Sequence, residues 1–230
     1  MTFHIITIFP EIFDSYINES IIGRAIKNKI IKVQFYNPRD FIKDKKQNGY
    51  RPVDHRPYGG GPGMVMRPEP ILKAVEKALA NISKKGGNKK TGKMIPKILT
   101  INFIPKAEKF TTTDAKKISK KYTDVILICG RYEGVDARVD KILKTKKYSI
   151  GDYVVTGGEL PAMILVDSVS RQLQGVLGKF ESLEEERVSS SEVYTRPEVL
   201  KYKGKNYKVP KVLLSGNHAE IDAWKKQSNM

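Results

Sequence analysis

The stretch Ser149–Met163 reads Ser-Ile-Gly-Asp-Tyr-Val-Val-Thr-Gly-Gly-Glu-Leu-Pro-Ala-Met. It places three glycines and an apolar run just before a segment whose composition suits a helix. Glycine-rich backbone of this kind can pass close to a small ligand and present bare N–H and C=O groups to it. A second glycine-bearing turn, Cys129–Gly134, follows the apolar run Val125–Ile128. Two such loops, each at the end of a predicted strand, predict a ligand crevice at the carboxyl edge of an α/β sheet.

Short β-rich apolar runs alternate along the chain with segments of helical periodicity. The predicted strands are Phe3–Phe9, Ile31–Tyr36, Ile98–Phe103, Val125–Cys129 and Tyr148–Val155. The predicted helices are Pro68–Ala80, Thr113–Lys121 and Leu160–Leu173, together with Asn217–Lys226 as a docked helix near the C-terminus. This alternation predicts the α/β class, with a mostly parallel sheet and helices on both of its faces.

The chain is expected to divide at a segment without apolar periodicity. The acidic stretch Glu181–Arg187 is followed by three serines, Ser189–Ser191, and this composition is typical of a mobile linker. We therefore expect a catalytic, cofactor-binding domain over residues 1–178, a flexible linker over 179–193 and a C-terminal segment over 194–230. The last segment is too short to build a core of its own.

The composition excludes several classes of protein. With 230 residues, of which 40% are hydrophobic and 29% charged, the chain can bury a core and is neither membrane-spanning nor broadly disordered. Cys129 is the only cysteine, which excludes an internal disulfide and fits a reducing cytoplasm. The net charge of +17 favours a polyanionic partner, nucleic acid first, although a lysine-rich composition alone would give the same excess.

The glycine loop Tyr58–Met64 (Tyr-Gly-Gly-Gly-Pro-Gly-Met) leaves two interpretations open. It can cradle a phosphate or a nucleotide backbone, because free amides before a helix attract anions, or it can be a structural turn. It matches neither a Walker loop nor the Gly-x-Gly-x-x-Gly dinucleotide motif. The three histidines, at positions 4, 55 and 218, have no metal-ligand spacing. With one cysteine and no nucleophile elbow, neither a metal site nor a Ser/Cys hydrolase is predicted.

Several motifs stand in a fixed order along the chain. They are Arg56–Met64, Cys129–Gly134, Ser149–Tyr153, Gly157–Met163, Asp167–Arg171, Tyr194–Glu198 and Leu213–Ile221. As an ordered set they are highly specific, and the chain resembles the TrmD family of bacterial tRNA (guanine-N1)-methyltransferases, within the SPOUT superfamily, from its first strand almost to its end. That family methylates N1 of the guanosine immediately 3′ of the anticodon, position 37 of tRNA, with S-adenosylmethionine as the methyl donor.

The resemblance implies a SPOUT-type fold, with a deep trefoil knot in the C-terminal part of the catalytic domain and a short helical appendage after it. It implies a cytoplasmic enzyme that acts on tRNA as a homodimer, with each active site built from both subunits. It also implies that residues 194–230 are a truncated tRNA-binding segment, since family members usually continue into a basic helical extension. An additional Mg²⁺ ion is compatible with the family but is not predicted from the sequence.

The resemblance also assigns the residues of the site. Arg171 matches the family arginine near guanine O6, and Glu186, ranked ahead of Glu185, matches the position of an aspartate that acts as general base. Asp54 matches an acid on the tRNA side, so Asp54 and Arg171 are the expected substrate contacts. The expected cofactor cradle consists of Phe103, Ile104, Pro105, Gly130, Tyr132, Glu133, Ser149, Ile150, Gly151, Asp152, Tyr153, Val154, Val155, Gly157, Gly158 and Pro161.

The chain departs from the family pattern at three places. A glutamate, Glu186, stands where the family has its aspartate, the usual Ser-Pro-Gln-Gly turn appears as Ile104–Ala107, and the tail ends early at Met230. These departures leave open a second interpretation, a catalytically weakened SPOUT-fold protein that binds RNA. A SPOUT methyltransferase that acts on another RNA is the third.

Overall fold

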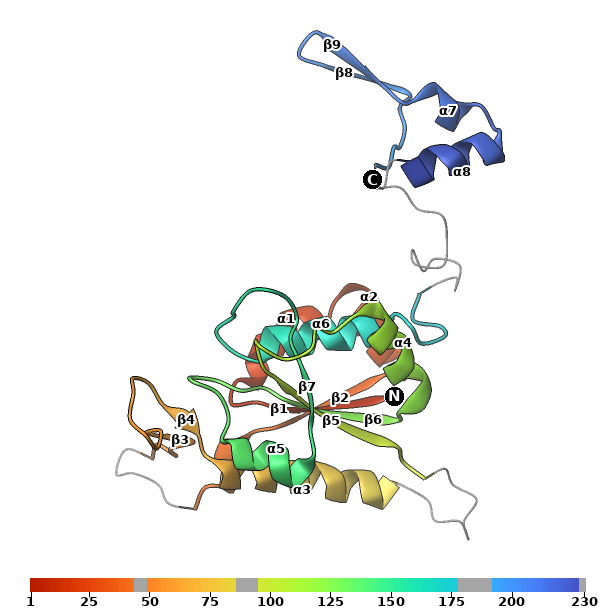
Figure 1. Cartoon of the computed structure of the whole chain (residues 1–230). Helices are drawn as coiled ribbons and strands as arrows, with labels where there is room; N and C mark the ends of the chain where they lie inside the picture. The colour runs from red at the N-terminus through yellow and green to blue at the C-terminus, as the bar shows by residue number, and fades with distance from the viewer. Residues whose placement is uncertain (44–48, 86–94, 178–191, 228–230) are drawn as a thin grey trace. The chain divides into compact units, whose positions relative to one another are not determined.

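The computed structural model describes residues 1–43, 49–85, 95–177 and 192–227. The chain divides into two compact units, Met1–Val176 and Leu177–Met230. In Figure 1 the colour runs from red at the N-terminus to blue at the C-terminus. Most of the linker expected over 179–193 lies outside the described residues.

A five-stranded parallel sheet forms the centre of the first unit. Its strands are β1 (Thr2–Ile6), β2 (Lys32–Tyr36), β5 (Ile98–Phe103), β6 (Asp124–Ile128) and β7 (Lys146–Tyr148), in the order β2-β1-β6-β5-β7. Every pairing between them is parallel, and Phe3 is in register with both Val33 and Val125. Four of the five residues of each central strand, β1 and β6, are buried, because both faces of the sheet are covered. The predicted α/β class with a mostly parallel sheet is confirmed.

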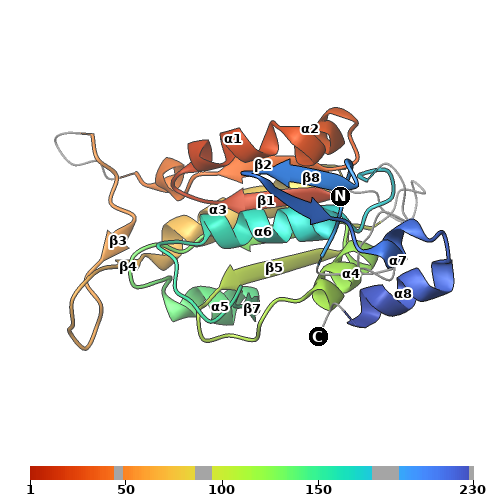
Figure 2. The ribbon, with the colours of Figure 1, turned by 90° about the horizontal axis from the view of Figure 1, so that it is seen from above.

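Helices cover both faces of this sheet (Figure 1). One face carries α1 (Asp14–Ile17), α2 (Ser20–Lys27), α4 (Thr112–Lys121) and α6 (Glu159–Ser170), and the other carries α3 (Pro68–Lys85) and α5 (Ala137–Leu143). Figure 2 shows α6 running along the sheet, with α4 on one side of it and α1 and α2 on the other. The short 3-10 turns η1 (Pro10–Phe13) and η2 (Pro38–Phe41) follow β1 and β2. The predicted helices are present as α3, α4 and α6, whereas α2 and α5 were not predicted.

Two predicted strands are too long. The strand predicted over Tyr148–Val155 ends at its first residue, because the Ser149 hydroxyl donates to the Gly151 carbonyl at 2.9 Å and turns the chain. The first predicted strand, Phe3–Phe9, ends at Ile6, where a 3-10 turn soon follows. The apolar residues after β7 therefore belong to a loop and not to the sheet.

A two-stranded antiparallel ribbon, β3 (Asp54–His55) and β4 (Val65–Met66), carries the glycine loop between its strands. Its strands have two residues each, too few for a pattern, and the sequence did not predict them. The Met66 amide donates to the Gly134 carbonyl at 2.9 Å, and the Met66 carbonyl accepts from the Asp136 amide at 3.1 Å. These bonds fix the ribbon to the turn that follows β6.

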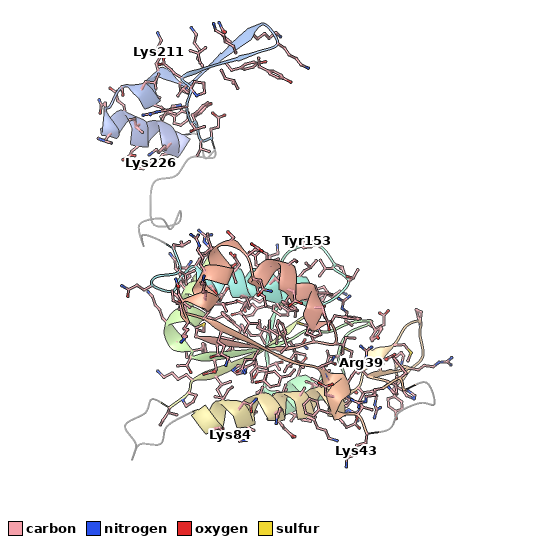
Figure 3. The ribbon with its side chains drawn as sticks, turned by 180° about the vertical axis from the view of Figure 1, so that it is seen from behind. Arg39, Lys43, Lys84, Tyr153, Lys211 and Lys226 are labelled. Atoms are coloured by element: carbon pink, nitrogen blue, oxygen red, sulfur yellow. The ribbon has the colours of Figure 1, made fainter. Side chains whose placement is uncertain are left out.

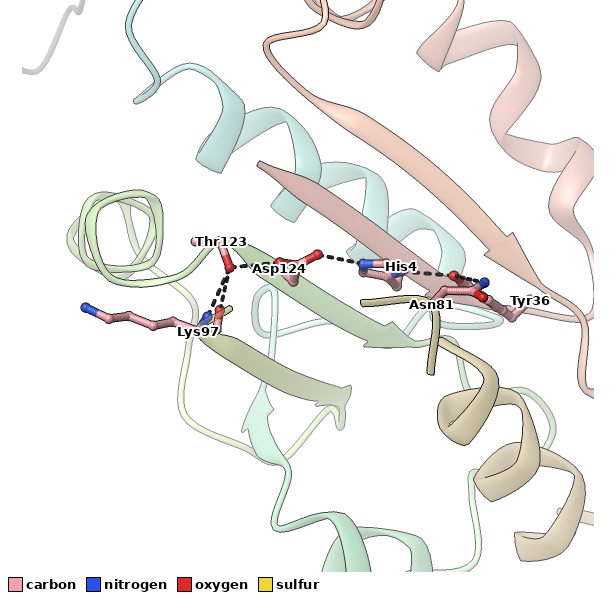
Figure 4. A network of polar contacts seen from close by, with 6 residues as sticks. All are labelled: His4, Tyr36, Asn81, Lys97, Thr123 and Asp124. Atoms are coloured by element: carbon pink, nitrogen blue, oxygen red, sulfur yellow. Dashed lines mark hydrogen bonds and ion pairs between the residues drawn. The ribbon is translucent and has the colours of Figure 1, made fainter. Parts of the chain in front are cut away.

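A buried polar network crosses the sheet from β2 to β6 (Figure 4). The His4 ring is fully buried, with Nδ1 3.1 Å from the Tyr36 hydroxyl and Nε2 2.9 Å from Asp124 Oδ1. The Thr123 hydroxyl donates to Asp124 at 2.8 Å, and Asn81 donates to the Tyr36 hydroxyl at 3.3 Å. Burial acts to raise the pKa of Asp124, but the hydrogen bonds from His4 and Thr123 outweigh it and hold that pKa below its usual value. The buried imidazole thus has partners for both nitrogens.

The second unit contains a hairpin and two helices. They are β8 (Val199–Tyr202), β9 (Lys205–Lys208), α7 (Lys211–Leu214) and α8 (His218–Gln227). The hairpin turn is Lys203–Gly204, with left-handed φ values of 46° and 73°, as a two-residue turn of the I′ type requires. The helix α8 confirms the helix predicted near the C-terminus. The hairpin was not predicted, because its strands carry lysines in place of apolar alternation.

Candidate active site

A cavity of about 340 Å³ opens at the carboxyl ends of β5, β6 and β7. Its walls come from residues 102–105 at the end of β5, residue 130 and residues 132–135 after β6, and residues 148–150 and 153–158 from the end of β7 onward, with Pro161 of α6. Parallel strands bring their carboxyl ends to one edge of the sheet, so these loops meet there. The crevice expected from the two glycine loops is therefore present, with a volume in the range of small-molecule sites.

The cavity brings together almost all residues expected around the cofactor. Gly151 and Asp152 are the exceptions, since neither lines the cavity and Asp152 pairs with Lys109 instead. The structure adds Asn102, Gly134, Val135, Tyr148 and Thr156 to the lining. Each of these lies within two positions of an expected residue, so a wider window around the same motifs would have found them.

The loop after β7 lies directly against the end of β6. The Gly158 amide donates to the Gly130 carbonyl at 2.8 Å, and Arg131 and Gly157 form an isolated antiparallel bridge. A Cβ atom at Gly158 would stand 2.5 Å from the Cys129 Cα, closer than real Cβ atoms approach. Only glycine at this position therefore lets the two segments form one wall of the cavity.

The turn after β6 presents two side chains at the cavity. Tyr132 has a left-handed φ of 60°, which is uncommon for a residue other than glycine. Burial, together with the nearby Asp54 and Tyr50, raises the pKa of the Tyr132 hydroxyl. The Glu133 carboxylate lies over Gly63, where an added Cβ would meet Glu133 Oε1 at 2.6 Å. The glycine loop of the ribbon thus reaches the cavity wall at Gly63.

The polar side chains of the lining are largely engaged within the protein. The Asn102 amide donates to Asp140 Oδ1 at 2.9 Å, and the Tyr148 hydroxyl donates to Asp114 at 3.2 Å. Burial, with the Asp114 carboxylate, raises the pKa of Tyr148 to about 12, so this hydroxyl stays protonated. Among the described residues that line the cavity, Glu133 is the charged side chain, and there is no lysine or arginine. A ligand here meets apolar side chains, backbone groups and one carboxylate.

The structure does not bring the expected catalytic arginine to the cavity. Arg171 follows the last residue of α6, and its amide donates to the Asp167 carbonyl at 3.0 Å. It stands ten positions after Pro161, the α6 residue that lines the cavity. Ten residues of α-helix span about 15 Å. Within one chain, Arg171 and the cavity therefore lie at opposite ends of α6.

Of the two other residues expected in the site, Asp54 is described by the structure and Glu186 is not. Asp54 lies in β3, where it accepts from the Tyr50 hydroxyl at 3.4 Å, and its charge acts on Tyr132 at the cavity. Glu186 lies outside the described residues, as does its neighbour Glu185. Over the ranges that the structure describes, no group of three or more His, Cys, Asp or Glu side chains is arranged to hold a metal ion. No helix in those ranges is long and apolar enough to cross a membrane.

Comparison with known proteins covers the whole chain. Residues 1–230 match the family model described as tRNA (Guanine-1)-methyltransferase TrmD. A tRNA (guanine-N(1)-)-methyltransferase of Clostridioides difficile is 44% identical over 100% of this chain and 93% of its own length. A protein of the same description from Buchnera aphidicola is 42% identical over 98% of this chain and 89% of its own.

A solved structure agrees with these relatives. The crystal structure of tRNA (m1G37) methyltransferase from Aquifex aeolicus superposes with a TM-score of 0.72 at 38% identity, covering 98% of this chain and 87% of that chain. Sequence and fold therefore agree over almost the full length of the chain. On this evidence, the chain belongs to the TrmD family of tRNA (guanine-1)-methyltransferases.

Proposed function

We propose that this chain transfers a methyl group from S-adenosylmethionine to N1 of the guanosine immediately 3′ of the anticodon in tRNA. Membership of the TrmD family over the whole chain supports the activity and the tRNA substrate. The observation that carries the proposal is the cavity at the carboxyl edge, whose wall includes closely apposed glycine backbone at Gly130 and Gly158.

The lining fits the proposed methyl donor. S-adenosylmethionine is a nucleoside that carries a sulfonium and supplies an already activated methyl group when bound. Apolar side chains such as Ile104, Pro105 and Ile150 suit an adenosine, and the Glu133 carboxylate suits a cationic ligand. The absence of lysine and arginine among the described lining residues disfavours a phosphate-bearing nucleotide.

The acceptor requires proton removal and charge control. Guanine N1 carries a proton at neutral pH, so a general base must remove it. We assign this role to the Glu186 carboxylate, with Glu185 as the second candidate. Negative charge then develops on O6, where the Arg171 guanidinium donates hydrogen bonds to it. We also assign Asp54 to contact with the tRNA, and its effect on Tyr132 at the cavity supports this assignment.

We propose that the active enzyme is a homodimer with composite sites. The separation of Arg171 from the cavity along α6 supports this, because a second subunit could bring its own Arg171 to the first subunit's cavity. Large apolar side chains exposed on α6 and the loop before it also support a partner surface, since Leu160 is 51% and Val154 is 79% exposed. Tyr153, labelled in Figure 3, is 56% exposed in the same loop.

We further propose that the end of the first unit is a trefoil knot. After β6 the chain runs through α5 and β7 and then returns, at Gly157–Gly158, to the end of β6 before α6 begins. We also propose a division into a catalytic domain over 1–178, a linker over 179–193 and a tRNA-binding appendage over 194–230. The cytoplasm, where tRNA is found, is the proposed location. No step is assigned to Mg²⁺.

Methyl transfer to unmodified tRNA tests the activity. Purified protein with methyl-labelled S-adenosylmethionine should label a transcript that has guanosine beside the anticodon, and should not label the same transcript with adenosine there. Calorimetry should detect binding of S-adenosylhomocysteine. Binding of this product without methyl transfer would favour the catalytically weakened RNA-binding protein, and absence of both would contradict the proposal.

Mixed dimers test the composite site. Arg171→Ala and Glu186→Ala proteins should each lose turnover but keep affinity for S-adenosylhomocysteine. If the two residues act from different subunits, random mixing gives one intact site in half of the dimers and restores about a quarter of wild-type turnover. Absence of recovery, with heterodimers verified by mass, would place both residues in one subunit. Loss of turnover in Glu185→Ala, with turnover kept in Glu186→Ala, would move the base to Glu185.

A further inference from the structure

We propose that the buried ion pair between Arg131 and Glu159, called the clasp below, fixes the position of Gly157 and Gly158 in the wall of the cavity. Arg131 lies in the turn after β6, and Glu159 is the first residue of α6. The pair therefore joins the turn after β6 to the start of α6, directly after Gly157 and Gly158 of the cavity wall. Neither side chain belongs to the lining, so both act through their neighbours as positioning residues. The inference rests on the function proposed above, because it concerns binding of the methyl donor.

The clasp ties three elements together. Arg131 Nε lies 2.9 Å from Glu159 Oε2, and these side chains are only 19% and 2% exposed. The other Glu159 oxygen accepts from the Thr7 hydroxyl, just after β1, at 2.8 Å. The Arg131 guanidinium lies 4.8 Å from the centre of the Phe9 ring. The ends of β1 and β6 and the start of α6 thus converge on one carboxylate and one guanidinium.

The clasp stands directly behind the cavity wall at Gly157. A Cβ atom built on Gly157 would lie 2.4 Å from Arg131 Nε and 2.7 Å from Glu159 Oε2. The pair therefore occupies the space that a side chain at Gly157 would need. Gly157 and Gly158 both line the cavity, so a change in the pair is transmitted to backbone that a ligand would touch.

Stability alone does not account for this pair. Although the two atoms are 2.9 Å apart, neither Arg131 Nε nor Glu159 Oε2 has an aligned hydrogen-bond partner among the described residues. A buried ion pair with imperfect hydrogen bonding recovers little of its desolvation cost. Apolar side chains of similar volume in its place often stabilise a fold equally or more. A directional charge pair, in contrast, holds two backbone segments, here the turn after β6 and the start of α6, at a fixed distance from each other. That distance is what a preorganised ligand cradle requires.

The test removes both charges and leaves polar side chains that can still form hydrogen bonds. In the double variant Arg131→Gln with Glu159→Gln, an amide oxygen can still accept from Thr7, and no unpaired charge is left buried. Affinity for S-adenosylhomocysteine, measured by calorimetry well below the unfolding temperature, should fall at least tenfold while the thermal midpoint stays near that of the wild type. In steady state the KM for S-adenosylmethionine should rise while kcat changes less than twofold. Arg131→Lys, which keeps the charge, should lose less affinity than the double variant.

A neighbouring ion pair provides the matched control. Asp136→Asn neutralises the partly exposed pair that Asp136 forms with Arg138 at 2.7 Å, and asparagine still caps α5. This variant should bind S-adenosylhomocysteine within twofold of the wild type. If the double variant does the same, the inference is wrong and the proposed function stands. If the double variant also unfolds more than about 10 °C lower, the pair is structural and the inference is likewise wrong. If the wild type does not bind the product, both proposals fail.

Discussion

At the scale of single residues, the contact of Gly158 with the end of β6 depends on the absence of a side chain. Its Cβ would meet Cys129 Cα at 2.5 Å and the Gly130 amide nitrogen at 2.9 Å, both of which belong to the backbone and cannot rotate away. We expect Gly158→Ala to lower the free energy of unfolding by about 3 kcal/mol, at the upper end of overpacking costs. For a domain of this size the thermal midpoint should fall by roughly 6–12 °C. Scanning calorimetry with and without S-adenosylhomocysteine measures both stability and ligand binding.

A second glycine in the same wall gives the control for this prediction. A Cβ at Gly130 would meet only the Val135 Cγ2 atom, at 3.2 Å, and that side chain can give way. Gly130→Ala should therefore cost much less stability than Gly158→Ala. Equal midpoints for the two variants would mean that the contact at Gly158 relaxes, and that the close approach of the two loops does not depend on glycine there.

At the scale of elements, the β8–β9 hairpin concentrates positive charge. From Val199 to Lys211 the chain has five lysines and no acidic residue, and residues 201–208 are all exposed. The cross-strand pair of Leu200 with Tyr207 adds an aromatic surface beside these charges. Lysines bind the phosphate backbone of RNA and release counterions, and tyrosines can stack on unpaired bases. We therefore expect this hairpin to contact tRNA.

Removal of hairpin charge should weaken tRNA binding in a salt-dependent way. The triple variant with Ala at Lys201, Lys205 and Lys208 should reduce the slope of log affinity against log salt by about 2 to 3, if each lysine neutralises one phosphate. Filter binding or fluorescence anisotropy over a salt series measures this slope. The matched control removes Lys73, Lys77 and Lys84, which are exposed on α3, and should change the slope less. An unchanged slope for the hairpin variant would exclude the hairpin as a phosphate-binding surface.

At the scale of the whole molecule, the hydrogen-bond network in Figure 4 makes the free energy of unfolding depend on pH. The pKa of Asp124 is lower in the folded protein than its usual value. A carboxyl group with a lowered folded pKa stabilises the fold above its unfolded pKa, near 4, and this stabilisation is lost as pH falls through the folded pKa. Asp124→Asn should therefore lower the free energy of unfolding by about 1–3 kcal/mol at pH 7. The wild-type and variant curves should converge as the pH falls through the lowered pKa of Asp124 in the folded protein.

Urea unfolding between neutral and acidic pH measures this difference. Asp40→Asn provides the control, since the Asp40 side chain is 70% exposed and lies 4.0 Å from Arg51. Exposed ion pairs of this kind contribute at most about 1 kcal/mol, so the control should remain close to the wild type at every pH. A gap between wild type and Asp124→Asn that persists once Asp124 is protonated in the folded protein would show that the carboxylate charge is not the cause.

The sequence by itself determined the class of the fold and most of the cavity. Buried parallel strands are local apolar runs such as Val125–Ile128, and a glycine-rich turn is visible wherever it occurs in the chain. Because the carboxyl ends of parallel strands share one edge, two such turns sufficed to place a crevice. The ordered motifs, matched residue by residue to a family, then named most of the residues that line it.

The tertiary structure alone decided how distant segments meet. The apolar run after Tyr148 reads as a strand locally, but the turn formed by Ser149 removes it from the sheet. The ion pair of Arg131 with Glu159 and the hydrogen bond from Thr7 join positions separated by 28 and 152 residues, which no local pattern encodes. The length of α6 likewise keeps Arg171 away from its own cavity. Local propensity depends on neighbouring residues and can be inferred from the sequence. Contacts between distant residues depend on packing of the whole chain, which only the folded structure specifies.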